Sequence, residues 1–144
     1  MKKLATNTVA LLCLSALLAS CGQDEVPMPE LSFEESLQKQ LIEARAGDVI
    51  IIPTGVHEIT RSLSLTVSGV TIRGAGIDAS ILSFANQIQG AEGLLVSAND
   101  FVIEDLAIED TVGDAIKINQ SRNVVIRNVR TEWTGGPLST NGAY

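Results

Sequence analysis

Cysteine, histidine and aromatic side chains are all scarce in this sequence, and each shortage narrows the classes of site it can hold. The 144 residues include two cysteines and one histidine. Thiolate metal sites and disulfide frameworks need more cysteine than this. With three phenylalanines, one tyrosine and one tryptophan, aromatic platforms for stacking on sugars are scarce as well. We therefore expect no cofactor, except for calcium, which binds oxygen ligands.

Basic residues are also outnumbered. The chain has 17 Asp and Glu against 10 Lys and Arg, for a net charge of −7. An acidic chain argues against nucleic acid as a partner and against electrostatic attachment to anionic lipid. It also disfavours a strong site for a polyanionic sugar such as pectate or alginate, unless calcium bridges the two.

Residues 1–20 have the pattern of a targeting segment. Lys2 and Lys3 supply a positive start, and Val9–Leu18 is an apolar run too short to span a bilayer as a mature helix. The residues that lead into Cys21, Leu-Ala-Ser, resemble the lipobox of bacterial lipoproteins. That resemblance implies diacylglyceryl transfer to the Cys21 thiol and cleavage before it. The alternative is an ordinary signal peptide in which Cys21 is incidental.

The lipobox resemblance also implies a location and a partner. Acyl chains on Cys21 would hold the protein stably on a membrane. Gly22 follows the cysteine where an aspartate would mark retention at the inner membrane. We therefore expect a bacterial cell-envelope protein on the outer membrane, at its periplasmic or surface face. Residues 21–31, with two prolines and several acids, are expected to form an extended or disordered acidic tether.

Residues 32–46 are predicted to form a helix that covers one end of the domain. Ser32 and Glu35 have the spacing of a capping box, and Gly47 is a stop signal. The apolar residues of this stretch fall on one helical face: Phe33, Leu37, Leu41 and Ala44.

A short pattern of apolar and polar residues then recurs three times. Its copies are centred on Ile72, Ile103 and Ile126. Two apolar-x-apolar strands with a polar corner between them make up each unit, and a further strand comes after them in the last two. Such recurrence is the signature of a stacked repeat, in which the three isoleucines would form one buried column. The longer first unit requires a bulging loop within residues 74–93, beside a further buried strand near Leu82.

Matched outward positions accompany this column. Arg73, Glu104 and Arg127 would form a ladder of alternating charge on a solvent-exposed face. Asp105 and Asn128 match in the same way and would begin a polar stack.

With these repeats the chain resembles the right-handed parallel β-helix of the pectin-lyase-like superfamily. The resemblance rests on two segments, Ala46–Ile59 and Val70–Gly76, which are similar to that superfamily's first coil and second-coil turn. It implies an all-β solenoid over residues 47–144 with few coils. Because the sequence has no capping element after the last repeat, we expect an N-terminal portion whose last coil is open to self-association.

Chemistry is the least predictable feature. The best cluster for catalysis is Glu109, Asp110 and Asp114 with Lys117, because paired carboxylates can act as acid and base on a glycosidic bond. Asp110 and Asp114 are also the calcium candidates. The competing interpretation is charged residues on a solvated coil surface.

Four further residues are candidates for a functional role. Arg127 and Arg130 could serve a lyase, which needs a cation near the sugar carboxylate. Trp133 is the candidate for carbohydrate binding, and His57 is interpreted as a corner residue without an orienting partner.

Three functions remain open at this point. The chain could be a lipid-anchored β-helix domain that is structural or binds polysaccharide, with no catalysis in this stretch. It could be the N-terminal part of a polysaccharide lyase, hydrolase or epimerase that lacks its active coils. It could also be an accessory protein for metal-cofactor assembly, although it has almost no metal ligands. The superfamily itself does not decide between these, because its fold hosts many activities.

Overall fold

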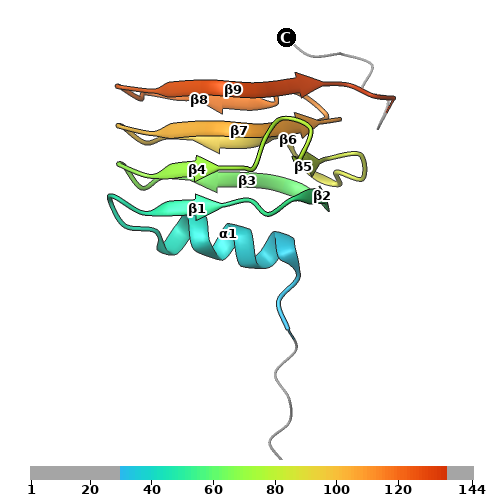
Figure 1. Cartoon of the computed structure of the whole chain (residues 1–144), viewed down its shortest axis with the longest axis horizontal. Helices are drawn as coiled ribbons and strands as arrows, with labels where there is room; N and C mark the ends of the chain where they lie inside the picture. The colour runs from blue at the N-terminus through green and yellow to red at the C-terminus, as the bar shows by residue number, and fades with distance from the viewer. Residues whose placement is uncertain (1–29, 136–144) are drawn as a thin grey trace, which may run out of the picture.

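Nine strands wind into a parallel β-solenoid of about three turns that stands on one helix (Figure 1). The computed structural model describes residues 30–135. The predicted signal segment, Cys21 and most of the tether lie outside the described residues, as do residues 136–144, so the predictions made for them stay predictions. The parallel β-helix with a helix before it confirms the predicted fold class.

The helix α1 (Phe33–Glu43) begins at the predicted capping box. The Ser32 hydroxyl accepts a hydrogen bond from the Glu35 N–H, and the Glu35 carboxylate accepts one from the Ser32 N–H. This arrangement satisfies two of the backbone donors that a helix start leaves free. The helix ends at Glu43, earlier than predicted, because Ala44 is already in an extended conformation with ψ 157°.

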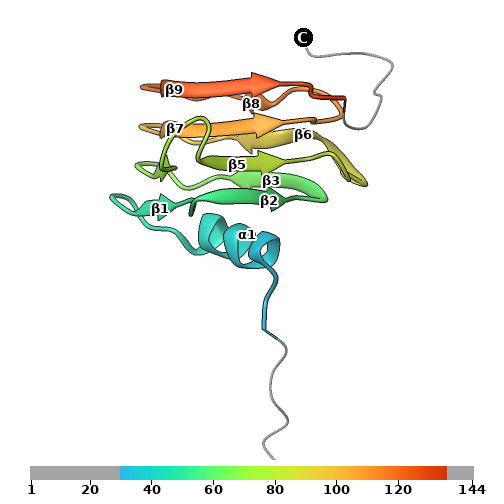
Figure 2. The same cartoon turned by 45° about the vertical axis from the view of Figure 1, so that its right-hand side comes forward.

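The strands form two sheets, which Figures 1 and 2 show as stacked rungs. One sheet has the order β1-β4-β7-β5-β2 with β9 added to β7, and the other has the order β3-β6-β8. All pairings are parallel. The bounds are β1 (Val49–Ile51), β2 (Gly55–Glu58), β3 (Arg61–Leu65), β4 (Thr71–Arg73), β5 (Ser80–Ser83), β6 (Gln89–Val96), β7 (Val102–Glu109), β8 (Ile116–Ile118) and β9 (Val125–Glu132).

The predicted isoleucine column is present and extends one coil further down. Ile72 pairs with Ile103, and Ile103 pairs with Ile126. Ile50 pairs with Ile72 beneath them. On the second sheet the apolar positions also align as predicted, in the columns Leu63, Leu94, Ile116 and Leu65, Val96, Ile118. Neighbouring coils lie about 4.8 Å apart. Each apolar side chain therefore packs against the like side chains above and below it in its column.

Left-handed residues turn the chain at matching places in successive coils. Asp105 and Asn128 have φ of 57° and 49° and interrupt β7 and β9 at the same register. The Asn128 amide donates to the Asp105 carboxylate at 2.7 Å, which confirms the predicted polar stack. Asp100 and Asn123 repeat this arrangement one corner earlier, again at 2.7 Å. Asp and Asn tolerate this conformation better than other non-glycine residues, so these corners follow from the sequence.

The bulging loop of the longer unit lies at residues 74–79, immediately before β5. Leu82 on β5 is buried, as predicted for this extra strand. The later part of the range 74–93, in which the loop was predicted, contains a strand. Gln89 already begins β6, which pairs with β3 through a register shift between Arg61 and Leu63. The start of this strand could not be recognised from its polar composition, because side chains on the outer face of a strand can be polar.

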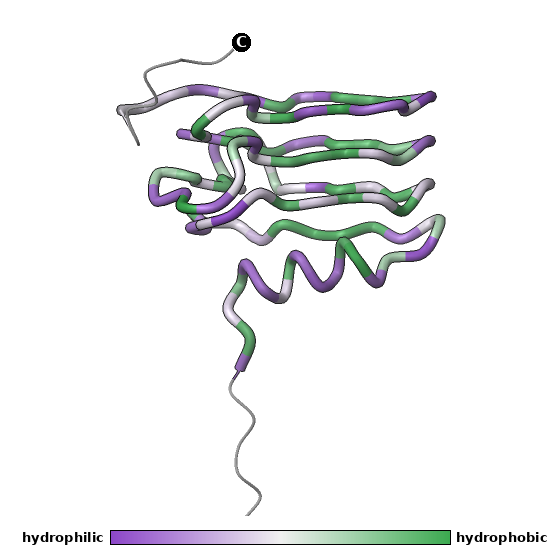
Figure 3. The backbone as a smooth tube through the Cα atoms, turned by 180° about the vertical axis from the view of Figure 1, so that it is seen from behind, coloured by the Kyte–Doolittle hydropathy of each residue, from purple (hydrophilic) through white to green (hydrophobic). Residues whose placement is uncertain are grey.

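The two ends of the stack differ. At the lower end α1 packs under the first coil and buries Leu37 and Leu41 with Ile50 and Ile52. At the upper end no element within residues 30–135 covers β8 and β9. Figure 3 shows that apolar residues recur along the strands of every coil, including this last one. Among residues 30–135, no helix has the length and apolar character that a membrane crossing demands.

Candidate functional site

The uncovered upper coil contains a hollow of about 310 Å³. It lies above β8 and β9, which have no strand over them among the described residues, and both polar and apolar groups line it. A carboxylate, a hydroxyl and an indole stand among these apolar groups. The lining residues are Asp114, Ala115, Ile116, Ile126, Val129, Thr131 and Trp133.

Asp114 and Trp133, two of the predicted functional residues, therefore share one hollow. Trp133 is half-buried, and its indole N–H donates to the Thr111 carbonyl at 2.6 Å. This bond fixes the ring against the corner that follows β7. An aromatic ring beside a carboxylate is the combination that binds a sugar through an apolar face and hydroxyl groups. Sequence distance concealed this pairing, because the two residues belong to opposite ends of one coil.

Glu109 and Asp110, the other two carboxylates of the predicted catalytic cluster, do not line the hollow. Glu109 accepts from the Arg130 guanidinium at 2.8 Å. Asp110 is 3% exposed and accepts from the Thr134 N–H and hydroxyl, both at 2.6 Å. The Asp110 carboxylate therefore holds Thr134 against the corner after β7. The backbone of Asp110 is left-handed there, with φ 58°. Both hydrogen bonds satisfy polar groups that would otherwise be buried without a partner.

Lys117 has a second, closer partner besides Asp114 of the predicted cluster. Its ammonium lies 2.9 Å from the Glu92 carboxylate and 4.0 Å from that of Asp114. The hydrogen bond between Lys117 and Glu92 lowers the pKa of Glu92 and raises the pKa of Lys117. The sequence did not reveal Glu92 as a partner, because it lies within the range 74–93 in which the loop was predicted, whereas β6 and β8 are neighbouring strands.

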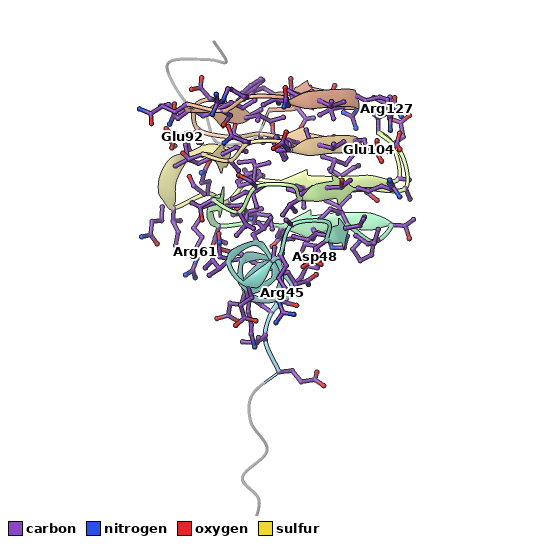
Figure 4. All side chains as sticks on the ribbon, turned by 90° about the vertical axis from the view of Figure 1, so that its left-hand side faces the viewer. Arg45, Asp48, Arg61, Glu92, Glu104 and Arg127 are labelled. Atoms are coloured by element: carbon purple, nitrogen blue, oxygen red, sulfur yellow. The ribbon has the colours of Figure 1, made fainter. Side chains whose placement is uncertain are left out.

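The predicted charge ladder is the most ordered polar feature of the solenoid (Figure 4). Arg73 and Arg127 lie one coil below and one coil above Glu104 in register. The Arg73 Nε donates to Glu104 Oε1 at 2.5 Å, and the Arg127 Nη2 donates to Glu104 Oε2. Glu104 is 2% exposed. Hydrogen bonds from Arg73, and then from Arg127, lower the pKa of Glu104, so it stays ionised between the two cations.

Arg130 ties the last coil to the earlier ones. Its guanidinium contacts Glu109 below it and Glu132 on its own strand, and it donates to the Ile77 carbonyl at 3.0 Å. Glu109 and Glu132 are neighbours in register, so Arg130 neutralises two like charges that would repel each other. Partial burial opposes the charged form of Arg130, but the hydrogen bonds to both glutamates outweigh it and raise its pKa.

His57 lies on strand β2 rather than at the predicted corner, and it is partly buried. It pairs with Leu82, which pairs with Ile108, so it is the lowest member of a buried column. Its ring stacks on Phe33 of α1 with the ring centroids 3.9 Å apart. Its Nε2 lies 3.0 Å from the Pro53 carbonyl oxygen. The contact with the helix is what the sequence could not supply, because Phe33 is distant along the chain.

A metal site is not formed by the part of the chain that the structure describes. Within residues 30–135, no three His, Cys, Asp or Glu side chains gather closely enough to hold an ion. The calcium candidates Asp110 and Asp114 are instead bound into the corner and placed in the hollow respectively.

No protein-family model, curated protein or solved structure matches this chain. The structure itself shows a parallel β-solenoid, and what the chain does must be argued from its own side chains.

Proposed function

We propose that this chain is a lipid-anchored β-solenoid of the bacterial cell envelope whose role is structural, with no catalysis in the stretch present here. We further propose that it belongs with the right-handed β-helices of the pectin-lyase-like superfamily, on the strength of the two segments that resemble them.

One observation carries the structural role. The charged side chains that could have served catalysis bind other groups of the solenoid. Glu104 binds two arginines, Glu109 binds Arg130, and Asp110 binds Thr134. A general acid or base needs a carboxyl that can reach a substrate and exchange a proton with it. These carboxylates instead join one coil to the next.

The position of α1 supports the anchored arrangement. The tether would enter at the start of α1, under the first coil, and the open coil lies at the opposite end of the stack (Figure 1). Acylation at Cys21 would therefore leave the open coil pointing away from the membrane, with the helix-covered end next to it. A short tether of about ten residues reaches at most about 35 Å, so the covered end would stay close to the bilayer.

Replacement of Cys21 tests the anchor, and the chain provides a matched control. With Cys21→Ser we expect loss of incorporated radiolabelled palmitate and a larger protein that keeps the signal segment, because cleavage before residue 21 accompanies acylation. Cys13→Ser should change neither, because that residue lies within the predicted signal segment. Equal behaviour of the two variants would mean that Cys21 is incidental and that the anchor does not exist.

A second candidate, polysaccharide binding, is favoured by the hollow that Asp114 and Trp133 share. The acidic chain points to a neutral sugar rather than a polyanionic one. Titration of neutral oligosaccharides into the chain without its signal segment and Cys21, residues 22–144, followed by calorimetry and tryptophan fluorescence, tests this. Binding that Trp133→Ala and Asp114→Asn both abolish would establish it, and the absence of heat and of a fluorescence change would leave the structural role.

A further inference from the structure

The last coil presents an apolar surface that the rest of the solenoid buries. Ile126 is 50% exposed, whereas Ile103, directly below it in the same column, is 0% exposed. Ile118 is 36% exposed, whereas Val96 below it is 0% exposed. Among the described strands, β9 pairs with β7 alone and β8 with β6 alone. The upper end therefore combines exposed core positions with a free strand edge, which is a template for pairing with another strand.

The other end of the solenoid cannot supply the matching surface. Helix α1 lies under the first coil there, and Leu37 and Leu41 fill the space that another coil would need. Copies of this chain therefore cannot stack head to tail into a filament. The upper end can meet only the upper end of a second copy, in a two-fold arrangement that closes after two copies.

The charges along β9 fit such an arrangement. Arg127 lies near the start of the strand and is exposed, with 67% of its side chain accessible. Glu132 ends the strand, with 46% of its side chain accessible. A two-fold axis reverses the direction of the second strand, so it brings the Arg127 end of each copy to the Glu132 end of the other. Within its own copy Arg127 shares Glu104 with Arg73, so that group keeps one positive charge. Glu132 shares Arg130 with Glu109, so that group keeps one negative charge. Opposite charges on neighbouring antiparallel strands attract, so the order of net charge along β9 favours self-pairing.

We propose that the upper end is the interface of a two-fold homodimer in which β9 pairs antiparallel with β9 of a second copy. The two hollows then face each other, and Ile126, Val129 and Trp133 of each copy become buried. The pairing continues the core of the solenoid across the two-fold axis and removes the free edge. This inference does not depend on the lipid anchor, since the covered end lies away from the interface.

The test measures the dimer dissociation constant of the chain without its signal segment and Cys21, residues 22–144, by sedimentation equilibrium in the absence of detergent. We expect a reversible monomer–dimer equilibrium and no larger species. Ile126→Asp should raise the dissociation constant at least tenfold, because the new carboxylate would be buried in the interface. The matched control is Val56→Asp on the first coil, where the side chain is 64% exposed in the monomer. This control should leave the dissociation constant unchanged.

The direction of pairing is tested by charge. Glu132→Gln should weaken the dimer and make its dissociation constant less sensitive to salt, because one partner of each Arg127–Glu132 pair is removed. A monomer at every concentration, equal effects of Ile126→Asp and Val56→Asp, or assembly beyond two copies would each overturn the proposal. So would a chain shortened after Gly135 that dimerises while the full chain does not, since residues 136–144 would then be the occupant. Because all of these proteins lack the acylated cysteine, a failure here is separate from a failure of the anchor.

Discussion

The two ends of this solenoid have similar apolar residues but differ in what covers them. The lower end is closed by α1, and the first coil's core residues Ile50 and Ile52 are 5% and 0% exposed. The upper end has no such cover within residues 30–135, and Ile126 is half exposed. Each coil has inward-facing apolar side chains. Whether those side chains are buried depends on the element that is stacked against the coil. The energetics of one residue type should therefore differ between coils.

The largest expected effect is a matched pair of truncations within one column. Ile103→Ala should cost about 2–5 kcal/mol of unfolding free energy, because it leaves a cavity between two coils. Ile126→Ala should cost about 1 kcal/mol, because half of its side chain already meets water. Urea denaturation at low protein concentration measures both.

The dependence on protein concentration separates the two alanine variants further. If a second copy buries Ile126, the cost of Ile126→Ala grows as the concentration rises, whereas the cost of Ile103→Ala does not. Equal losses at the lowest concentration would mean that another part of the same chain already covers Ile126.

A smaller effect is expected at the covered end, from the helix cap. Ser32→Ala removes the hydroxyl that accepts from the Glu35 N–H and should cost about 1 kcal/mol. Hydrogen exchange measured strand by strand should show faster exchange in β3, against which α1 packs, and unchanged exchange in β9. The control is Ser36→Ala, because the Ser36 hydroxyl only accepts from the Gln40 amide on the exposed face. Faster exchange throughout the stack would show instead that the solenoid opens as one unit.

Much of the fold could be predicted from the sequence, because the same pattern of apolar and polar residues recurs in each coil of a solenoid. The columns of Ile72, Ile103 and Ile126 follow from a spacing that strand geometry requires. The ladder at Glu104 follows from the same register, one position further along. Such features need no knowledge of contacts between different kinds of element.

The parts that could not be predicted are contacts between positions that do not repeat. Phe33 stacks on His57 because a helix crosses the first coil, and no spacing in the sequence encodes that crossing. Glu92 binds Lys117 because β6 extends into a segment whose composition is that of a loop. Asp114 and Trp133 meet because the chain makes nearly a full turn between them. The sequence therefore predicted individual residues of the candidate site, but not which of them lie close together.

The smallest expected effect separates the two arginines that share Glu104, one on an inner coil and one on the open coil. Arg73 and Arg127 are exposed at 48% and 67% of their side chains, so each ion pair is partly screened by water. Both lower the pKa of Glu104 below its ordinary value of 4.5, and the hydrogen bond from Arg73 contributes the most. A lowered carboxyl pKa stabilises the folded state above pH 4.5 and ceases to do so as the pH falls through the folded pKa.

Arg73→Gln should therefore lower the melting temperature at neutral pH more than Arg127→Gln does. Both differences from the parent should shrink as the pH falls below 4.5, where Glu104 becomes protonated with or without the arginine. Thermal melts of the three proteins across that range measure this. A difference that stays constant with pH would mean that the arginine side chains stabilise the coil through packing of their alkyl chains, and that the inner and open coils do not differ in charge pairing.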